Sequence, residues 1–406
     1  MSSSFDPPPG AWPPAYAVKR RLLSPIQRLL EVEAASGWVL LAATVIALGW
    51  ANSPWAGAYR ALWGTELAVG LGPWRFAEPL AFWVNDGAMT IFFFVAGLEI
   101  RRELHDGALS TRRRAALPVV AAVGGMLAPA AIYAALNTGR AGGAGWGVPM
   151  ATDIAFAIGA LALLGSRVSA ALRVWLLALA VIDDIGAILV IAIFYSAELH
   201  AEGAAIAAAG LAAVIAMQLF GVRHAVAYVV PGVVVWAGLL VTGIHPTLAG
   251  VILGLCTPVR AADDEGGPAA RLHDALHPWV AFAIMPVFAL ANAGIALGRA
   301  SLAGDAGLVF FGIALGLVVG KPLGILLASR LAVRARIAAP APAGGLVVGV
   351  VAGIGFTMSM FIAQLALPAG PLLDTAKLAI LVGSLISAGL GLALGRRQLA
   401  RPATMA

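Results

Sequence analysis

Two adjacent aspartates, Asp183 and Asp184, lie inside the apolar run LALAVIDDIGAILVIAI at residues 177–193. Each central aspartate costs a membrane helix roughly 2.5 to 3.5 kcal/mol, which the surrounding Leu, Ile, Val and Phe residues offset with little margin. Burial and mutual repulsion disfavour a charged carboxylate, so one of the pair can exchange a proton near neutral pH. When deprotonated, it is a hard oxygen ligand suited to a hard cation such as sodium. The same group can therefore hold a proton or a cation but not both, and neighbours about 100° apart on a helix need not share one role.

A third charged residue, Lys321, lies within the apolar segment VVGKPLGILL. One interpretation is that it snorkels toward the nearest membrane surface, roughly 13 Å away along a helix. The other is that it pairs with an acid, Asp153 or Asp183, because an isolated buried charge is costly. Desolvation favours the neutral form of a lysine, so a buried Lys321 could also release a proton.

Two glutamates, Glu99 and Glu103, lie at the end of the apolar segment LAFWVNDGAMTIFFFVAGLEIRREL. Residues four apart share a face of a helix, so the pair could line an entrance for a cation. The pair could equally form a charge cluster at the membrane surface with Arg101 and Arg102, and the sequence leaves both interpretations open. Asp86, nearer the other end of this segment, has no assigned role.

Two histidines, His273 and His277, have the same i, i+4 spacing in the string RLHDALHPWVAF. Histidines at a membrane edge titrate near neutral pH and could sense it. A zinc site is disfavoured because no further ligands follow at suitable spacing. His245, in the string GIHPTLAG, is expected to cap a turn.

The elements that must position these residues are helices in a membrane. Of the 406 residues, 61% are hydrophobic and 11% are charged, whereas a soluble domain has about 25% charged residues. The apolar blocks are long enough for helices to cross a hydrocarbon core of about 30 Å, and the alternating segments of about ten residues typical of a β-barrel are not seen. The predicted fold class is an all-α integral membrane protein with twelve transmembrane helices. These spans are expected at 36–52, 80–100, 115–136, 148–165, 172–195, 203–220, 224–243, 246–259, 273–297, 306–329, 345–367 and 373–395.

The predicted domain organisation is a Pro-rich cytoplasmic tail (1–24), a twelve-helix domain (25–400) and a short cytoplasmic C-terminal tail (401–406). A cleaved signal peptide in place of the first span is disfavoured, since eleven further spans follow it. Twelve spans place both termini on one side of the membrane, and that side holds most of the 26 Lys and Arg residues. By the positive-inside rule both termini are then cytoplasmic. The net charge of +6 therefore reflects topology, and no nucleic-acid partner is expected.

Two of the predicted spans look interrupted near their middle. Span four carries Pro149, Thr152 and Asp153, and span eleven carries Gly353 and Gly355 in the string GIGFTMS. If spans three to five and ten to twelve are two three-helix units, each unit has its weak span in the middle, and such pairs mark ion sites in transporters. The alternative is that the glycines only allow close helix packing.

Seven strings together resemble the bacterial NhaA-type sodium/proton antiporters, in the family's order, over about residues 25–400. They are WVNDGAMTIFFFVAGLEIRREL, PMATDIAFAIGALALLGSRV, LALAVIDDIGAILVIAIFY, GIHPTLAGVILG, LHPWVAFAIMPVFALANAGI, GKPLGI and GIGFTMSMFIA. The resemblance implies a twelve-helix antiporter of the bacterial inner membrane, usually a homodimer, with spans three to five and ten to twelve as inverted repeats. It also implies electrogenic export of Na+ or Li+ in exchange for a larger number of protons by alternating access, for pH and sodium homeostasis, with no cofactor.

The resemblance further implies roles for individual residues. Asp184 would be the main cation ligand, and Asp183 a proton-carrying second carboxylate able to pair with Lys321. Thr152 and Asp153 would lie at the break of span four, where Asp153 offsets the positive half-helix ends and Lys321 the negative ends. The interrupted span eleven corresponds to Gly353, Gly355 and Thr357, and the outer loop 64–79 corresponds to a dimerising β-hairpin.

The family's regulatory residues at the cytoplasmic entrance correspond to Glu99, Arg102, Glu103, His273 and His277. The start of span nine departs from the family pattern, because His273-Asp274 stands where the family has Glu-His, although His277 is kept. We therefore expect ion exchange to carry over to this chain more firmly than the family's activation by alkaline pH.

Three other functional classes fit the acids less well. An intramembrane aspartyl hydrolase needs two carboxylates that converge from different segments, whereas Asp183 and Asp184 are adjacent on one helix. A cation channel would use the same acids without coupling to protons, and a sodium-driven symporter would carry an organic anion. Lys321 near the acids favours protons over an organic solute.

Overall fold

A computed structural model describes residues 35–71, 74–105, 107, 109–196, 199–222, 224–259 and 267–399. Within these ranges the chain consists of helices, one antiparallel pair of strands and connecting loops. Nine of the described helices are long and apolar enough to cross a membrane, and the number rises to eleven if each of two bent helix pairs is one span. The chain is therefore a multi-pass membrane protein. The tails predicted at 1–24 and 401–406 lie outside the described residues.

The elements follow one another in the order below, where η marks a short 3-10 or π segment. The N-terminal half contains a helix at Ala35–Ala51, α2 (Ala56–Gly64), β1 (Glu66–Leu71), β2 (Trp74–Pro79), α3 (Leu80–Phe82), η1 (Trp83–Ala88), α4 (Met89–His105), α5 (Arg112–Asn137), η2 (Gly143–Met150), α6 (Ile154–Ala162), η3 (Gly165–Arg167) and α7 (Ala170–Phe194). The C-terminal half contains α8 (Ala201–Leu219), η4 (Ala225–Tyr228), α9 (Val229–Thr242), α10 (Leu248–Cys256), α11 (Gly267–Trp279), η5 (Val280–Ile284), α12 (Met285–Asn292), η6 (Leu297–Arg299), α13 (Gly304–Leu315), η7 (Gly316–Gly320), α14 (Lys321–Arg334), α15 (Gly345–Val351), α16 (Phe356–Ala366) and α17 (Pro371–Gln398).

The helices overlap the predicted spans, with two differences. The predicted span 246–259 corresponds to α10, whose nine residues extend only about 13 Å, less than half of a hydrocarbon core. The predicted span 36–52 is followed by a bend of 113° into α2, which the sequence pattern did not indicate. The total of twelve spans and the inverted repeats therefore remain predictions.

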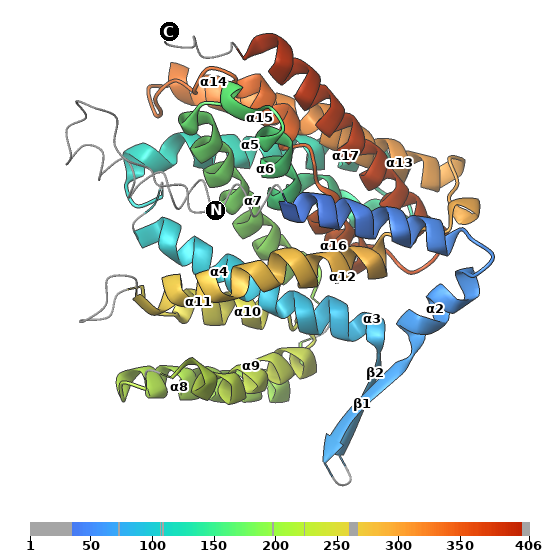
Figure 1. Cartoon of the computed structure of the whole chain (residues 1–406), viewed down its shortest axis with the longest axis vertical. Coiled ribbons are helices and arrows are strands. Elements are labelled where there is room, and N and C mark those ends of the chain that lie inside the picture. The colour runs from blue at the N-terminus through green and yellow to red at the C-terminus, as the bar shows by residue number, and fades with distance from the viewer. Residues whose placement is uncertain are drawn as a thin grey trace, which may run out of the picture.

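The predicted hairpin loop, 64–79, is a two-stranded antiparallel sheet. Strand β1 pairs with β2 from Glu66 opposite Pro79 to Leu71 opposite Trp74. The hairpin projects away from the helices (Figure 1), so the all-α description needs this one correction. The end of the bundle that carries the hairpin is called the hairpin side below. Helix α4 runs from the hairpin side to the opposite end of the bundle, and Glu99 lies near its last turn. This opposite end is called the Glu99 side.

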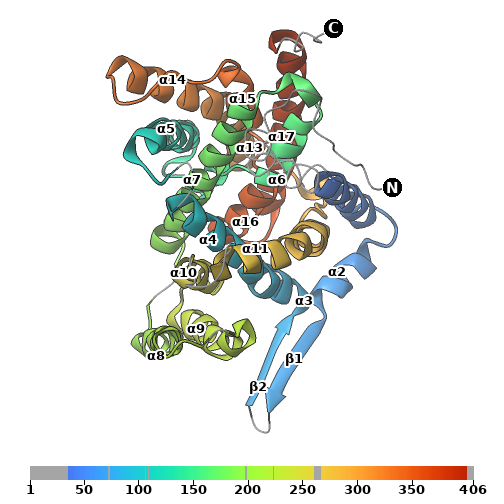
Figure 2. The same cartoon turned by 60° about the vertical axis from the view of Figure 1, so that its left-hand side comes forward.

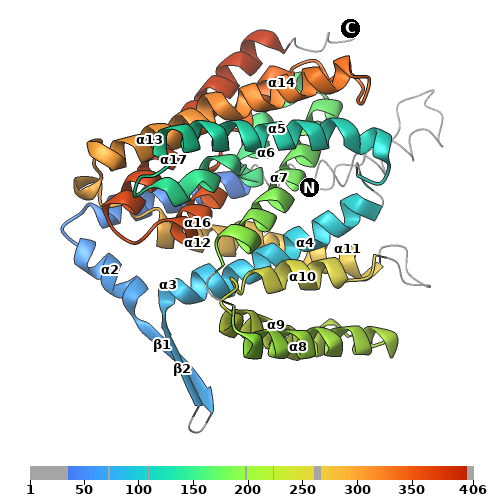
Figure 3. The ribbon, with the colours of Figure 1, turned by 180° about the vertical axis from the view of Figure 1, so that it is seen from behind.

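The helices form two groups (Figures 2 and 3). In the first group α10 and α11 pack along α4, α9 packs on α8 and α10, and α12 continues from α11. In the second group α13 and α14 pack along α5, and α17 packs along α13, α15 and α16. Helix α7, which carries Asp183 and Asp184, contacts α5 of the second group and α4 of the first. The two aspartates therefore lie where the groups meet.

Both predicted interruptions are present in the structure. The chain is extended at 151–153 between η2 and α6, and α15 and α16 are bent by 45° about a short break. The two breaks lie side by side, because the backbone N–H of Asp153 donates to the carbonyl oxygen of Ile354 at 2.7 Å. Gly353 is required by this close packing, since a Cβ there would lie 2.4 Å from the backbone oxygen of Leu317. The two interpretations of the glycines, a break and close packing, therefore hold together.

Candidate functional site

Asp183 is fully buried beside the break of span four. Its Oδ2 atom lies 2.8 Å from Nζ of Lys321, and both side chains are 0% exposed. The same Oδ2 atom lies 2.6 Å from the hydroxyl of Thr152, which is also 2.9 Å from the carbonyl oxygen of Ala352. Of the two partners that the sequence offered for Lys321, the structure selects Asp183, and the snorkelling interpretation is wrong.

Lys321 also contacts the end of a half-helix. It follows the π segment η7 and begins α14, and its Nζ donates a hydrogen bond to the carbonyl oxygen of Met150, the last residue of η2. Carbonyl groups at the C-terminal end of a helix carry partial negative charge. The ammonium group therefore lies between a carboxylate and the negative end of a half-helix, the kind of end that the family resemblance assigned to Lys321.

Asp153 lies at the start of both C-terminal half-helices. It is the N-cap of α6, where its Oδ1 accepts from the backbone N–H of Phe156 at 3.1 Å. Its Oδ2 accepts from the backbone N–H of Thr357 at 3.1 Å and from the hydroxyl of Thr357, in the first turn of α16. N-terminal helix ends carry partial positive charge. One carboxylate thus faces two positive half-helix ends.

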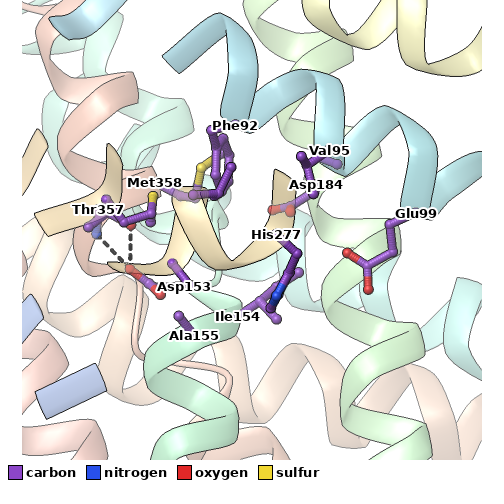
Figure 4. A pocket seen from close by; sticks show the side chains of 14 residues that line it. Phe92, Val95, Glu99, Asp153, Ile154, Ala155, Asp184, His277, Thr357 and Met358 are labelled. Carbon is purple, nitrogen blue, oxygen red and sulfur yellow. Dashed lines mark hydrogen bonds between the residues drawn. The ribbon is translucent and has the colours of Figure 1, made fainter. Parts of the chain in front are cut away.

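Asp184, one residue beyond Asp183, faces a pocket between the two helix groups (Figure 4). The polar residues that line this pocket are Glu99, Asp153, Asp184, His277 and Thr357, and the rest of its wall is apolar. Oδ1 of Asp184 is buried and has no hydrogen-bond partner within the described part of the chain. Carboxylate and hydroxyl oxygens are the ligands that hard cations prefer, and an apolar wall strengthens their electrostatic attraction.

The predicted entrance residues divide into two sets. Glu99 and His277 line the pocket on the Glu99 side, whereas Arg102, Glu103 and His273 do not. The rings of His273 and His277 stack with centroids 5.2 Å apart, and Nδ1 of His273 lies 3.2 Å from Oδ1 of Asp274. Among the described residues no group of three or more His, Cys, Asp and Glu side chains could hold a metal ion.

Two serines that sequence reasoning missed fix the broken helices. The hydroxyl of Ser359, in α16, donates to the carbonyl oxygen of Val148 in η2 at 2.8 Å. The hydroxyl of Ser384, in α17, accepts from the backbone N–H of Phe356 at 3.1 Å and so satisfies one open donor of α16. For Ser359 the available signal was its position in the string GIGFTMS beside the predicted break, whereas Ser384, in α17, gave none.

His245 lies outside the described spans, on the hairpin side. Its Nε2 is 3.0 Å from the carbonyl oxygen of Tyr195, which directly follows α7. The carbonyl only accepts, so Nε2 carries the proton of this bond. Burial lowers the pKa of His245 below its usual value, and the hydrogen bond to Tyr195 offsets this only in part. The side chain of His245 therefore bonds the end of α7, and not the turn between α9 and α10 that contains it.

Comparison with known proteins gives one consistent family. A family model described as Na+/H+ antiporter 1 matches residues 27–394. The chain is 54% identical to the Na(+)/H(+) antiporter NhaA 2 of Sorangium cellulosum, over 98% of this chain and 94% of that protein. It is 49% identical to the protein of the same name from Myxococcus xanthus, over 98% of this chain and 95% of that protein. It is 54% identical to the Na(+)/H(+) antiporter NhaA of Acidovorax sp., over 91% of each chain.

Proposed function

Because the chain belongs to the Na+/H+ antiporter 1 family, we propose that it is an electrogenic secondary transporter that exports Na+ or Li+ in exchange for more than one proton. The observation that carries this proposal is the unequal environment of the two aspartates. Oδ1 of each aspartate is buried without a hydrogen-bond partner in the described part of the chain, but Oδ2 of Asp183 is held by Lys321 and Thr152, whereas Asp184 faces the pocket and has no such ion pair there. A carboxylate in that position is stabilised by binding either a proton or a cation.

Asp184 would be the main cation ligand in this mechanism. Asp153 and Thr357 supply further oxygen atoms on the same pocket wall, although their present hydrogen bonds hold them to each other. Glu99, which lines the same pocket nearer its cytoplasmic end, would attract the cation toward Asp184. Binding of Na+ requires Asp184 to be deprotonated, so arrival of the cation and departure of a proton are coupled at one group.

Asp183 and Lys321 would move a second proton. A charged Asp183 receives the ammonium group of Lys321 and can accept from Thr152. A protonated Asp183 can instead donate to the Thr152 hydroxyl, which then donates to the carbonyl oxygen of Ala352. Each protonation state therefore has a hydrogen-bond partner, which lowers the cost of switching between them. A second proton carrier supports exchange of more than one proton per cation.

Alternating access would arise between the two helix groups. The broken helices of the second group carry Asp153 and Thr357, while the first group supplies Glu99 and His277 to the same pocket. Movement of one group against the other would expose the pocket first to one side and then to the opposite side. Because protons and cations share one site, each opening exchanges one for the other.

The membrane setting follows from charge and surface. We place the Glu99 side in the cytoplasm and the chain in the bacterial inner membrane, with both termini cytoplasmic, because most Lys and Arg residues flank that side. Large apolar side chains are exposed on the helices, among them Leu219, Val230 and Leu385 at 82%, 71% and 73%, as suits contact with lipid.

The projecting hairpin β1–β2 would join two copies into a homodimer (Figure 1).

The pH response would come from the Glu99 side. Glu99, Arg102, Glu103, His273 and His277 lie at this end of α4 and α11, and the stacked histidines belong to the same helix. Because His273 and Asp274 depart from the family's order, we propose an activation pH that differs from the family's alkaline profile.

The decisive experiment measures proton movement in everted membrane vesicles energised by respiration. Addition of Na+ or Li+ should release protons from the lumen, and Asp184→Asn should abolish this release. The matched control is Asp305→Asn, because Asp305 is a partly exposed acid that pairs with Arg140 and does not line the pocket. A wild-type protein that conducts sodium without moving protons would establish a channel and contradict the proposal.

A further inference from the structure

Three side-chain amides form a layer on the hairpin side of the pocket. Nδ2 of Asn85, in η1, donates to Oε1 of Gln364, in α16, at 2.9 Å. Nδ2 of Asn292, the last residue of α12, donates to Oδ1 of Asn85 at 2.7 Å. Asn292 is 4% exposed, and Asn85 and Gln364 are partly buried, so the layer lies mostly inside the protein. These residues are called the amide layer.

An aromatic layer separates the amide layer from the pocket. Phe361 lies with its ring centroid 5.3 Å from that of Phe93 and 6.3 Å from that of Phe288, and all three are at most 2% exposed. Along α16 the pocket residue Met358, the aromatic Phe361 and the amide Gln364 follow one another three residues apart, close to one helical turn. Along α12 the order is the same from Met285 through Phe288 to Asn292. The region between the pocket and the hairpin side is therefore filled first by rings and then by amides.

The bond between Asn85 and Gln364 joins the two helix groups. Asn85 precedes α4 and Asn292 ends α12, so both belong to the first group, whereas Gln364 lies on α16 of the second. Opening of the pocket toward the hairpin side requires the two groups to separate at this point, and separation breaks this hydrogen bond. The bond from Asn292 to Asn85 stays within the first group and holds Asn85 in place.

We propose that the amide layer is a latch, in which Asn85, Asn292 and Gln364 are positioning residues that hold the pocket closed on the hairpin side while it is open to the Glu99 side. The inference rests on the proposed function, because it assigns a part in alternating access to residues that touch neither cation nor proton. It names three amides that no predicted role in the sequence had covered.

The latch is made to open at modest cost. Nε2 of Gln364 is buried and has no hydrogen-bond partner within the described residues, so the closed layer is not fully satisfied. The bonds of the layer are between neutral amides, and a neutral hydrogen bond is weaker than a charged one. The latch therefore biases the two openings of the pocket without locking either of them.

The test measures access to the pocket from each side. Ala281 lines the pocket and is replaced by Cys as a reporter, in a Cys256→Ser background that removes the chain's own cysteine. A membrane-impermeant, charged thiol reagent is applied to right-side-out or everted vesicles. In the parent, labelling should be fast from the Glu99 side and slow from the hairpin side. Gln364→Met, which keeps side-chain length and removes the amide, should raise the hairpin-side rate about two- to tenfold, the factor expected from one net hydrogen bond.

Asn52→Leu is the matched control. Asn52 also makes an amide hydrogen bond on the hairpin side, to the carbonyl oxygen of Ile295 at 2.7 Å, but it contacts the loop after α12 and not the second group. Its labelling rates should equal those of the parent. Asn85→Leu should reproduce the effect of Gln364→Met, and the double variant should add nothing further, because both remove the same bond between the two helix groups. The bond from Asn292 that Asn85→Leu also removes lies within the first group. Asn85→Leu also takes the place of Gln364→Met in the test if Gln364→Met does not fold.

Two results would separate failure of the latch from failure of the proposed function. Equal hairpin-side rates in the parent, Gln364→Met and Asn85→Leu would overturn the latch, even if the wild-type protein exchanges Na+ for protons. The labelling assay needs no ion gradient, so a wild-type protein that performs no exchange would contradict the antiporter, while faster hairpin-side labelling of the variants would still support the latch.

Discussion

Replacement of Lys321 by Met should leave Asp183 as an uncompensated charge in the centre of the protein. Removal of one partner from a buried ion pair costs about 3–5 kcal/mol, and both partners here are 0% exposed. Asp183 would keep the Thr152 hydroxyl at 2.6 Å, which places the loss toward the lower end of that range. Met is close to Lys in length and unbranched, so the change removes the charge with little change in packing.

The reference for this variant is the double replacement Asp183→Asn with Lys321→Met. Both variants lose the hydrogen bond from Lys321 to the carbonyl oxygen of Met150, which costs about 1–3 kcal/mol in each. The difference between them therefore isolates the stranded carboxylate. We expect the single variant to be less stable than the double variant by about 3 kcal/mol at alkaline pH.

Thermal unfolding of the detergent-purified proteins, followed across pH, measures this difference. A protonated Asp183 needs no counter-charge, so acid should bring the single variant toward the double variant. Equal losses in both variants at every pH would refute the reasoning, because the charge of Asp183 would then not depend on Lys321. The double variant should also move fewer protons per Na+ in vesicles, since it lacks the second proton carrier.

Three further changes test other parts of the site. Gly353→Ala should destabilise the protein by about 1–3 kcal/mol because the new Cβ would lie 2.4 Å from a backbone oxygen, whereas Gly389→Ala, with nothing within 4 Å, should be neutral in thermal unfolding. Glu99→Gln should raise the Na+ concentration needed for half-maximal exchange, and Glu103→Gln, which is off the pocket wall, should change it less. Because the pKa of His245 is lowered in the folded protein, the unfolded chain binds more protons below about pH 6.5. The free energy of unfolding should therefore fall as the pH drops below that value, and it should fall less in His245→Gln.

The sequence indicated residues of the candidate site where a residue violates the rules of its surroundings. Asp183, Asp184 and Lys321 could be found because charges are costly within apolar spans. The breaks could be found because proline and closely spaced glycines weaken a helix. Both signals are local, so they can be recognised without knowledge of how the spans pack.

Contacts between distant spans could not be predicted in the same way. The choice of Asp183 as the partner of Lys321 depends on the depth at which α14 begins relative to α7, which no local pattern specifies. The carbonyl oxygens that accept from Lys321 and Thr152 belong to Met150 and Ala352, and every residue carries such an oxygen. The amide layer escaped notice for a related reason, since neutral amides are tolerated near helix ends.

In the proposed mechanism, the partners of the buried charges explain why Asp184 performs the exchange. Asp183 and Lys321 compensate each other at 2.8 Å, and Asp153 is compensated by the N-terminal ends of two half-helices. Asp184 has neither arrangement among the described residues and faces the pocket instead. A proton or a cation supplies what this carboxylate lacks, and only one of them can be accommodated at a time. We infer that the two ions are coupled because a proton and a cation compete for the uncompensated carboxylate of Asp184. The compensation of Asp183 and Asp153 keeps those carboxylates from binding the cation in its place.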